Sequence, residues 1–221
     1  MQKNQNKKYT LFLFDLDGTL LDTAREFHTA LNEILDKEKR PHQSFDNVRE
    51  KVSDGAGALV SLGFDINEQN VDFENKRNDL LKAYEKVYLN SEPFNGVEEV
   101  ISSFEEKNID WGIVTNKPRV FSEQIFKSLG WDIKAKLLVC PDDVENLRKP
   151  NPATLLLALK RLKYDASSAL YVGDNWRDLE AAKNSEITPI FAEYGYVNPE
   201  NFPSNENGYN IKCIREILSF I

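Results

Sequence analysis

Short, continuous apolar runs alternate with amphipathic segments along most of this chain, and this alternation is the feature that most constrains its fold. Such runs are typical of strands buried on both faces of a parallel sheet. The alternation therefore predicts an α/β fold: a doubly wound parallel sheet with helices on both faces, whose ligands bind at the carboxyl ends of the strands. The five predicted strands are Tyr9–Phe14, Ile109–Val114, Ala135–Val139, Ala169–Val172 and Thr188–Ala192, and the helices between them are Val97–Lys107, Val120–Leu129, Pro152–Leu162 and Asp178–Asn184.

One long segment breaks the alternation. Residues 22–92 are charged, rich in helix formers and without a convincing strand pattern. We expect them to form a helical cap domain, inserted into a Rossmann-like catalytic core made of residues 1–21 and 93–221. Proline and glycine punctuate chains at such joins, so Glu92 to Gly96 is the expected hinge. The polar segment 198–210 is assigned no role.

Charge and cysteine content exclude several classes of partner. The formal net charge of −8 opposes accumulation on nucleic acid or on an anionic membrane surface. No apolar stretch is long enough for a membrane helix, and the run after the basic start is too short for a signal peptide. Cys140 and Cys213 lie far apart without metal-ligand spacing, so the sequence suggests neither a disulfide framework nor a structural zinc site. We therefore expect a cytoplasmic protein. The oligomeric state is left open.

Acidic side chains follow two of the predicted strands. Asp15 and Asp17 lie two residues apart, so both carboxylates can reach one side of the chain, and Gly18 then permits a sharp turn. The alternative is a solvated Asp-Gly turn. Asp174 and Asp178 offer the hard oxygen ligands that Mg²⁺ prefers, although Asp at a helix start is also a common cap.

Two further motifs supply groups that suit a phosphate. Thr115 and Asn116 follow a predicted strand, where a hydroxyl, an amide and backbone N–H groups make an anion cradle. A turn stabilised by these side chains is the alternative. Lys149, between a loop and a predicted helix start, can supply fixed positive charge, unless it is simply solvated. All four motifs lie at strand ends or helix starts.

In this order, the four motifs resemble those of the haloacid dehalogenase-like hydrolase superfamily. The resemblance spans nearly the whole chain and is closest to the phosphoglycolate phosphatase-like group, in which a helical cap follows the first motif. In the cap, Ser53 stands where that group has a glycine. The segments that carry the closer resemblance are Thr115–Pro118, Lys149–Pro152, Tyr194–Tyr196, Val48–Arg49 and Gly55.

The resemblance implies a Mg²⁺-dependent phosphatase that works through a phospho-aspartyl intermediate. Asp15 would be the nucleophile, and Asp17 would protonate the leaving oxygen and later activate water. Lys149 would stabilise the transferred charge. The residues implied for phosphate binding are Gly18, Thr115, Asn116 and Lys149, and those implied for the metal are Asp15, Asp17 through its carbonyl, Asp174 and Asp178, the last as a ligand or as a group that orients one.

The expected substrate is a small phosphorylated carboxylic acid, with 2-phosphoglycolate first. The cap should choose it, with Arg49 pairing with the carboxylate and the backbone around Gly55 exposing N–H groups. The alternative is that Arg49 lies on a solvated helix face and that Gly55 merely ends that helix. Alternative activities are those of an inorganic pyrophosphatase, a nucleotidase or a sugar-phosphate phosphatase or phosphomutase, and the non-enzymatic alternative is a phosphate-sensing binding module.

Overall fold

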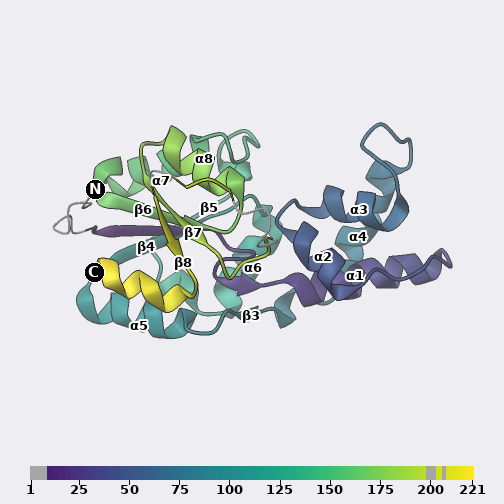
Figure 1. Ribbon diagram of the computed structural model, residues 1–221, viewed down its shortest axis with the longest axis horizontal. Helices are drawn as coiled ribbons and strands as arrows, with labels where there is room; N and C mark the ends of the chain where they lie inside the picture. Colours follow the sequence, from purple (N-terminus) through teal and green to yellow (C-terminus); the bar gives the residue numbers. More distant parts are fainter. Residues whose placement is uncertain (1–8, 198–202, 206–207) are drawn as a thin grey trace.

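In the computed structural model, which describes residues 9–197, 203–205 and 208–221, a parallel sheet and a separate group of helices lie side by side (Figure 1). Residues 198–202 and 206–207 of the polar segment 198–210 fall outside the described residues. None of the described helices is long and apolar enough to cross a membrane.

The sheet has six strands in the order β5-β4-β1-β6-β7-β8, and all neighbouring pairs are parallel. The predicted doubly wound α/β fold is thereby confirmed. The sixth strand, β8, was not predicted, because only one of its three residues is buried and no apolar run marks it. The strands are β1 Leu11–Phe14, β4 Asp110–Val114, β5 Leu138–Val139, β6 Ala169–Gly173, β7 Thr188–Ala192 and β8 Tyr209–Ile211.

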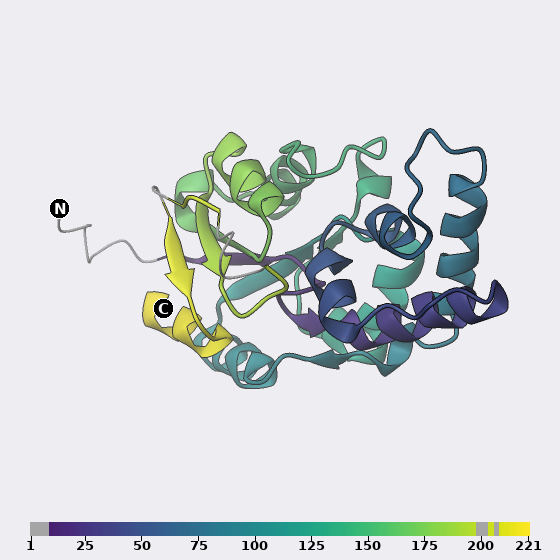
Figure 2. The same cartoon turned by 45° about the vertical axis from the view of Figure 1, so that its right-hand side comes forward.

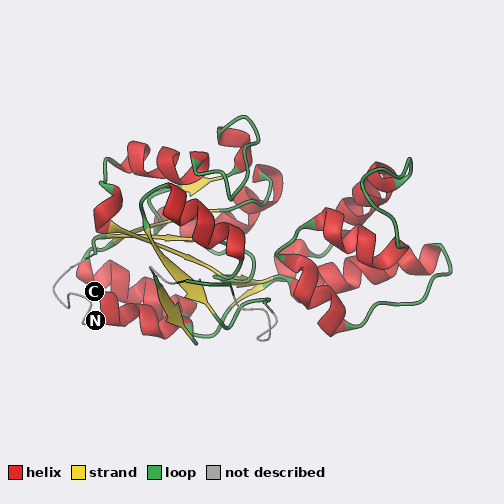
Figure 3. Cartoon of the chain, turned by 45° about the horizontal axis from the view of Figure 1, so that its top comes forward, coloured by secondary structure: helices red, strands yellow, loops and turns green. Residues whose placement is uncertain are grey.

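Helices cover both faces of this sheet (Figure 3). Alternate residues of β1 enter two different cores, as the two-residue period of a strand requires: Phe12 and Phe14 in one, Leu11 and Leu13 in the other. Helix α5 (Val97–Lys107), α6 (Arg119–Ser128) and the 3₁₀ segment Ile214–Phe220 contribute to the first core, and α7 (Ala153–Leu162) and α8 (Trp176–Asn184) to the second.

Four helices form the second body, beyond the carboxyl ends of the strands (Figure 2). They enclose a core of their own, joined by Phe121 and Tyr196 from the sheet domain. The chain enters through β2 (Leu21–Asp22) and returns through β3 (Glu92–Pro93), which pair antiparallel. Helices are found where the sequence predicts a cap over 22–92, and those domain bounds stay a prediction. The helices are α1 Ala24–Lys37, α2 Phe45–Val52, α3 Ala56–Phe64 and α4 Phe73–Tyr84.

Candidate active site

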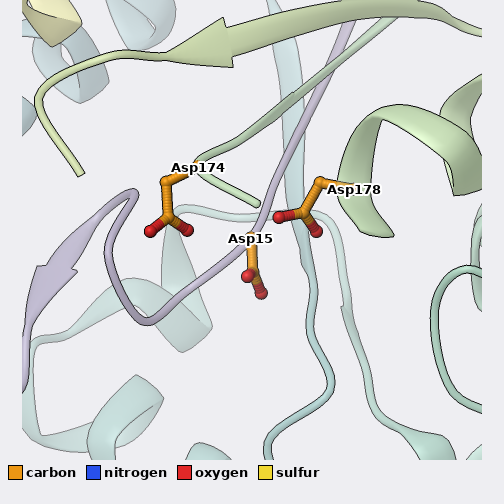
Figure 4. A group of neighbouring side chains, drawn as sticks. All are labelled: Asp15, Asp174 and Asp178. Carbon is orange, nitrogen blue, oxygen red and sulfur yellow. The ribbon is translucent and has the colours of Figure 1, made fainter. Parts of the chain in front are cut away.

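The site forms where the central strand ends. Strand β1 lies between β4 and β6, so the residues that follow these three strands meet at one edge of the sheet. Figure 4 shows Asp15, Asp174 and Asp178 side by side, arriving from the end of β1, the end of β6 and the first turn of α8. One oxygen from each carboxylate lies within 4.8 Å of the others. Three of the predicted metal residues are thus brought together.

Gly18 makes the turn after Asp17 possible. Its φ of +81° lies in the left-handed region, and a Cβ atom there would stand 2.3 Å from Asp174 Oδ2. A side chain at this position would therefore collide with a carboxylate of the site. The glycine lets the loop after β1 pass close to the loop after β6.

Asp174 is fully buried and only partly satisfied by the protein. Its Oδ2 accepts hydrogen bonds from Ser53 Oγ at 2.8 Å and from the Tyr196 backbone N–H at 2.9 Å. Its Oδ1 is buried and has no hydrogen-bond partner within the described part of the chain. Burial, and then the neighbouring charges of Asp178 and Asp15, raise the pKa of Asp174 to about 8.

Lys149 is the cation at the centre of the acidic cluster, with 3% of its surface exposed. Its Nζ lies 2.9 Å from Asp15 Oδ1 and 2.6 Å from Asp178 Oδ1, and it also donates to the Tyr171 hydroxyl at 2.6 Å. Burial alone would lower the pKa of Lys149, but Asp15 and Asp178 outweigh it and raise that pKa. The lysine therefore stays charged, and the solvated alternative is excluded.

Both oxygens of Asp178 are occupied by protein donors. Besides Lys149, the Tyr171 hydroxyl donates to Oδ1 at 3.2 Å, and the Asn175 backbone N–H donates to Oδ2 at 3.0 Å. The Asn175 bond belongs to a capping box at the start of α8, in which Asn175 is the N-cap and Asp178 is the third helical residue, so Asp178 has a capping role although neither aspartate is the cap itself. These bonds favour an orienting role for Asp178, which holds Lys149 and the loop in place. They speak against Asp178 as a direct metal ligand.

Thr115 and Asn116 lie where the sequence predicts, after β4, but they are used differently. Thr115 Oγ1 accepts from the Lys117 backbone N–H at 3.1 Å, which leaves the Thr115 hydroxyl proton for an incoming oxygen. The Asn116 side-chain amide donates to the Lys149 carbonyl at 3.1 Å and accepts from the Lys149 N–H at 2.8 Å. Asn116 therefore holds the Lys149 backbone, and its contact with substrate stays a prediction.

Asp17 lies on the side of the site that faces the cap helices. Lys117 Nζ donates to both of its carboxylate oxygens, at 3.0 and 3.1 Å, and to the Tyr84 hydroxyl at 2.9 Å. In the sequence, Lys117 stands out only as part of the Thr115–Pro118 segment, and nothing marks Tyr84. No local signal marks this pair, because Lys117 is 100 residues from Asp17 and Tyr84 lies on α4.

A cavity of about 590 Å³ opens between the cap helices and the strand ends, and Asp15, Asp17, Thr115 and Lys149 lie in its wall. Gly55, at the start of α3, also lines it. Its apolar wall includes Phe27, Val52, Phe73, Leu81, Tyr84 and Phe121, and its cationic residues include Arg77, Arg148 and Arg177.

The structure does not bring Arg49 into this cavity. The Arg49 guanidinium donates to the backbone carbonyls of Tyr194 and Gly195, the former at 3.2 Å, and stacks over the Tyr196 ring. It is half-buried between α2 and the loop after β7, so neither the carboxylate contact nor the solvated helix face describes it. Its position fits a residue that fastens the cap to the core.

Three more hydrogen bonds cross the same boundary, and the sequence predicts none of them. Ser53 of the cap donates to Asp174, as described above. Arg177, at the start of α8, donates to the Ser53 carbonyl at 2.7 Å and to Asp54 Oδ1 at 2.9 Å. Ser53 is one of the positions where the sequence departs from the phosphoglycolate phosphatase-like group, and that departure was the one local signal available.

The donor set fits a divalent cation such as Mg²⁺. Carboxylates are hard oxygen ligands, and burying three of them together is unfavourable without a compensating cation. Lys149 compensates Asp15 and Asp178, but the unpaired Asp174 Oδ1 and the raised Asp174 pKa show charge that the protein leaves uncompensated. Asp15 and Asp174 would hold the ion, which would supply charge neutralisation for a bound phosphoryl group.

Comparisons with known proteins agree with this geometry. The family profile described as haloacid dehalogenase-like hydrolase matches residues 12–192. A haloacid dehalogenase-like hydrolase structure from Bacteroides fragilis superposes with a TM-score of 0.83 at 23% identity, covering 95% of this chain and 100% of that one.

Two curated relatives are phosphatases. An N-acetylmuramic acid 6-phosphate phosphatase from Pseudomonas putida is 39% identical over 194 residues, which cover 87% of this chain and 86% of the relative. A phosphoglycolate phosphatase from Xanthomonas campestris pv. campestris is 35% identical over 185 residues, which cover 83% of each. The chain therefore belongs to the haloacid dehalogenase-like hydrolase family, and it is a phosphatase.

Proposed function

We propose that this phosphatase hydrolyses the phosphate ester of an acidic amino sugar, with N-acetylmuramic acid 6-phosphate as the preferred substrate, in a Mg²⁺-dependent reaction through phospho-Asp15. The observation that carries this choice is the cavity. Its volume of about 590 Å³ lies in the range that holds a drug-sized ligand, roughly 300–1,000 Å³. A two-carbon acid phosphate would leave most of that space to water.

The wall of the cavity also suits such a leaving group. Phe73 and Leu81 offer apolar contact to an acetyl methyl group and to a sugar face, and Arg148 and Arg77 offer positive charge to a carboxylate. Arg77 is paired with Glu74 at 3.0 Å, whereas Arg148 has no ion pair among the described residues. We therefore assign Arg148 as the main carboxylate partner, in place of Arg49.

The geometry at the strand ends supports the chemical roles that the family resemblance implies. An Asp15 oxygen attacks phosphorus while the bond from phosphorus to the sugar oxygen breaks, and Asp17 gives that oxygen its proton. Asp17 then removes a proton from the water that attacks the phosphoryl group and releases Asp15. Lys149 and the Thr115 hydroxyl stabilise the oxygens of the transferred group, with Asp178 holding Lys149 in place.

The second candidate substrate is 2-phosphoglycolate. Its support is the name of relatives such as the Xanthomonas campestris phosphoglycolate phosphatase. The decisive experiment compares kcat/KM for N-acetylmuramic acid 6-phosphate, 2-phosphoglycolate, inorganic pyrophosphate, a nucleoside monophosphate and a hexose phosphate. N-acetylglucosamine 6-phosphate, which lacks the carboxylate, is the matched control. We expect Arg148→Ala to lower kcat/KM for the acidic sugar ester and to leave this control nearly unchanged.

A higher kcat/KM for 2-phosphoglycolate than for the acidic sugar ester would overturn the substrate assignment and leave the phosphatase chemistry intact.

We also propose a cytoplasmic location, since Cys140 and Cys213 are both free thiols. Fractionation of cells that express the protein would test it.

A further inference from the structure

We propose that Lys117 is a positioning residue, which holds the Asp17 carboxylate for proton transfer and makes that geometry depend on the closed arrangement of the cap helices. This inference rests on the proposed function, in which Asp17 moves a proton to and from the reacting oxygens. Nothing in the family resemblance or in the comparisons assigns Lys117 a role.

The first support is the burial and pairing of the ammonium group. Lys117 is 6% exposed, and its Nζ bridges the two oxygens of Asp17 at 3.0 and 3.1 Å. A cation that bridges both oxygens restricts rotation of the carboxylate. A carboxylate has about four lone-pair positions, so these two bonds leave room on the Asp17 oxygens for the proton that the leaving oxygen takes, or for a hydrogen bond from water.

The second support is that the same ammonium group is held by the cap. Its third bond, at 2.9 Å, goes to the Tyr84 hydroxyl on α4, so all three of its donors are used. The Nζ also lies 4.7 Å from the centroid of the Tyr84 ring and 5.2 Å from that of Phe27. These two rings are stacked on each other, with centroids 4.0 Å apart. The position of Lys117 therefore depends on cap residues as much as on its own loop.

The third support is the continuation of this network to the hinge. The Tyr84 ring also packs against Tyr88, just before the hinge, with ring centroids 5.9 Å apart, and the Ser91 hydroxyl donates to Glu26 at 3.0 Å. Ser91 directly precedes β3, and Glu26 lies in the first turn of α1, soon after β2. The chain of contacts thus runs from Asp17 to both connections between the sheet domain and the cap.

These contacts give closure a chemical consequence. If the cap helices moved away from the strand ends, Lys117 would lose the Tyr84 hydroxyl and both aromatic faces. A buried ammonium group is stable only while its partners remain, so Lys117 and Asp17 would rearrange together. Asp17 would then be held for proton transfer only when the cap is closed over a substrate, and the acid would be disordered when water has free access.

The experiment uses two esters that differ in whether their leaving group needs a proton. This difference separates a role of Lys117 in positioning Asp17 from a role in stabilising the fold alone. An alkyl phosphate needs its leaving oxygen protonated, whereas para-nitrophenyl phosphate releases a stable phenolate without one. We compare kcat/KM, which reports the first phosphoryl transfer, in saturating Mg²⁺ for Lys117→Met and for the matched surface control Lys127→Met. The alkyl ester is N-acetylmuramic acid 6-phosphate, or 2-phosphoglycolate if the enzyme prefers it.

We expect Lys117→Met to lower the ratio of alkyl to aryl kcat/KM by about 10-fold or more, since general acid catalysis contributes roughly 10²–10⁴-fold. The control should leave the ratio unchanged. Adding Lys117→Met to Asp17→Asn should cost little further activity on the alkyl ester, because the lysine acts through Asp17. Equal losses on both esters, or fully additive losses in the double variant, would overturn the proposal.

Tyr84→Phe keeps the ring and removes only the hydroxyl that accepts from Lys117. It should lower the same ratio in the same direction by a smaller factor, and an unchanged ratio would count against the coupling to the cap. If Lys117→Met does not fold, the Tyr84→Phe ratio decides. If Asp17→Asn alone keeps alkyl turnover, the proposed role of Asp17 is wrong, a result distinct from a failure of Lys117.

Discussion

The unpaired charge of Asp174 predicts how the metal-free protein responds to pH. We expect its stability to fall from about pH 6 to about pH 8, and we expect Asp174→Asn to remove most of this fall. Burial, and then Asp178 and Asp15, raise the Asp174 pKa from an ordinary 3.8 to about 8 in the folded protein. The folded state therefore binds more protons than the unfolded state between these values, and stability is lost as the pH rises through the folded pKa.

The size of the effect follows from the same pKa. Between the ordinary pKa of 3.8 and the folded pKa of about 8, each unit by which the pH rises lowers the free energy of unfolding by about 1.4 kcal/mol. This slope falls to half at the folded pKa itself. The loss between about pH 6 and about pH 8 is therefore about 2 kcal/mol, or about 4–8 °C in Tm for a chain of this size.

Thermal unfolding followed by circular dichroism, in a chelating buffer, measures this loss. Asp174→Asn is the matched control, because its amide oxygen can still accept from Ser53 and from the Tyr196 backbone while every other titrating side chain is kept. Mg²⁺ competes with the proton for the carboxylate, so it should raise the wild-type Tm most at the higher pH. Equal pH slopes for wild type and Asp174→Asn would refute the reasoning.

Three further predictions concern activity. Asp15→Asn should abolish turnover of para-nitrophenyl phosphate because it removes the nucleophile. The variant should still fold, as circular dichroism can check, because Lys149 retains its ion pair with Asp178 at 2.6 Å. A folded variant with full activity would contradict the role of Asp15 as nucleophile. Lys149→Ala should lower kcat/KM by about 10²–10³-fold and the free energy of unfolding by about 3–5 kcal/mol, and unchanged kinetics would argue against its role in phosphoryl transfer. Arg49→Ala should lower kcat/KM for all esters by a similar factor, because it fastens the cap; loss for carboxylate-bearing esters alone would restore it as a substrate ligand.

The sequence alone predicted the arrangement of the catalytic core. The apolar runs that predict β1, β4 and β6 place the residues after them at one edge of a parallel sheet, whatever the details of packing. Asp15, Thr115 and Asp174 were found in this way, because a strand end and the residues that follow it are local features. Strand β8 was missed, since its place depends on pairing with β7 and not on an apolar pattern of its own.

The tertiary structure decided how these groups are partnered. Lys117 meets Asp17 across 100 residues of sequence and Ser53 meets Asp174 across 121, and both Tyr84 and Ser53 reach the site from the cap. Sequence periodicity predicts that the cap is helical, but not which helix face or helix end meets the strand ends. That docking places Arg49 on the loop after β7 instead of in the cavity. The partners of a buried charge are set by how two distinct hydrophobic cores pack against each other, which no local pattern encodes.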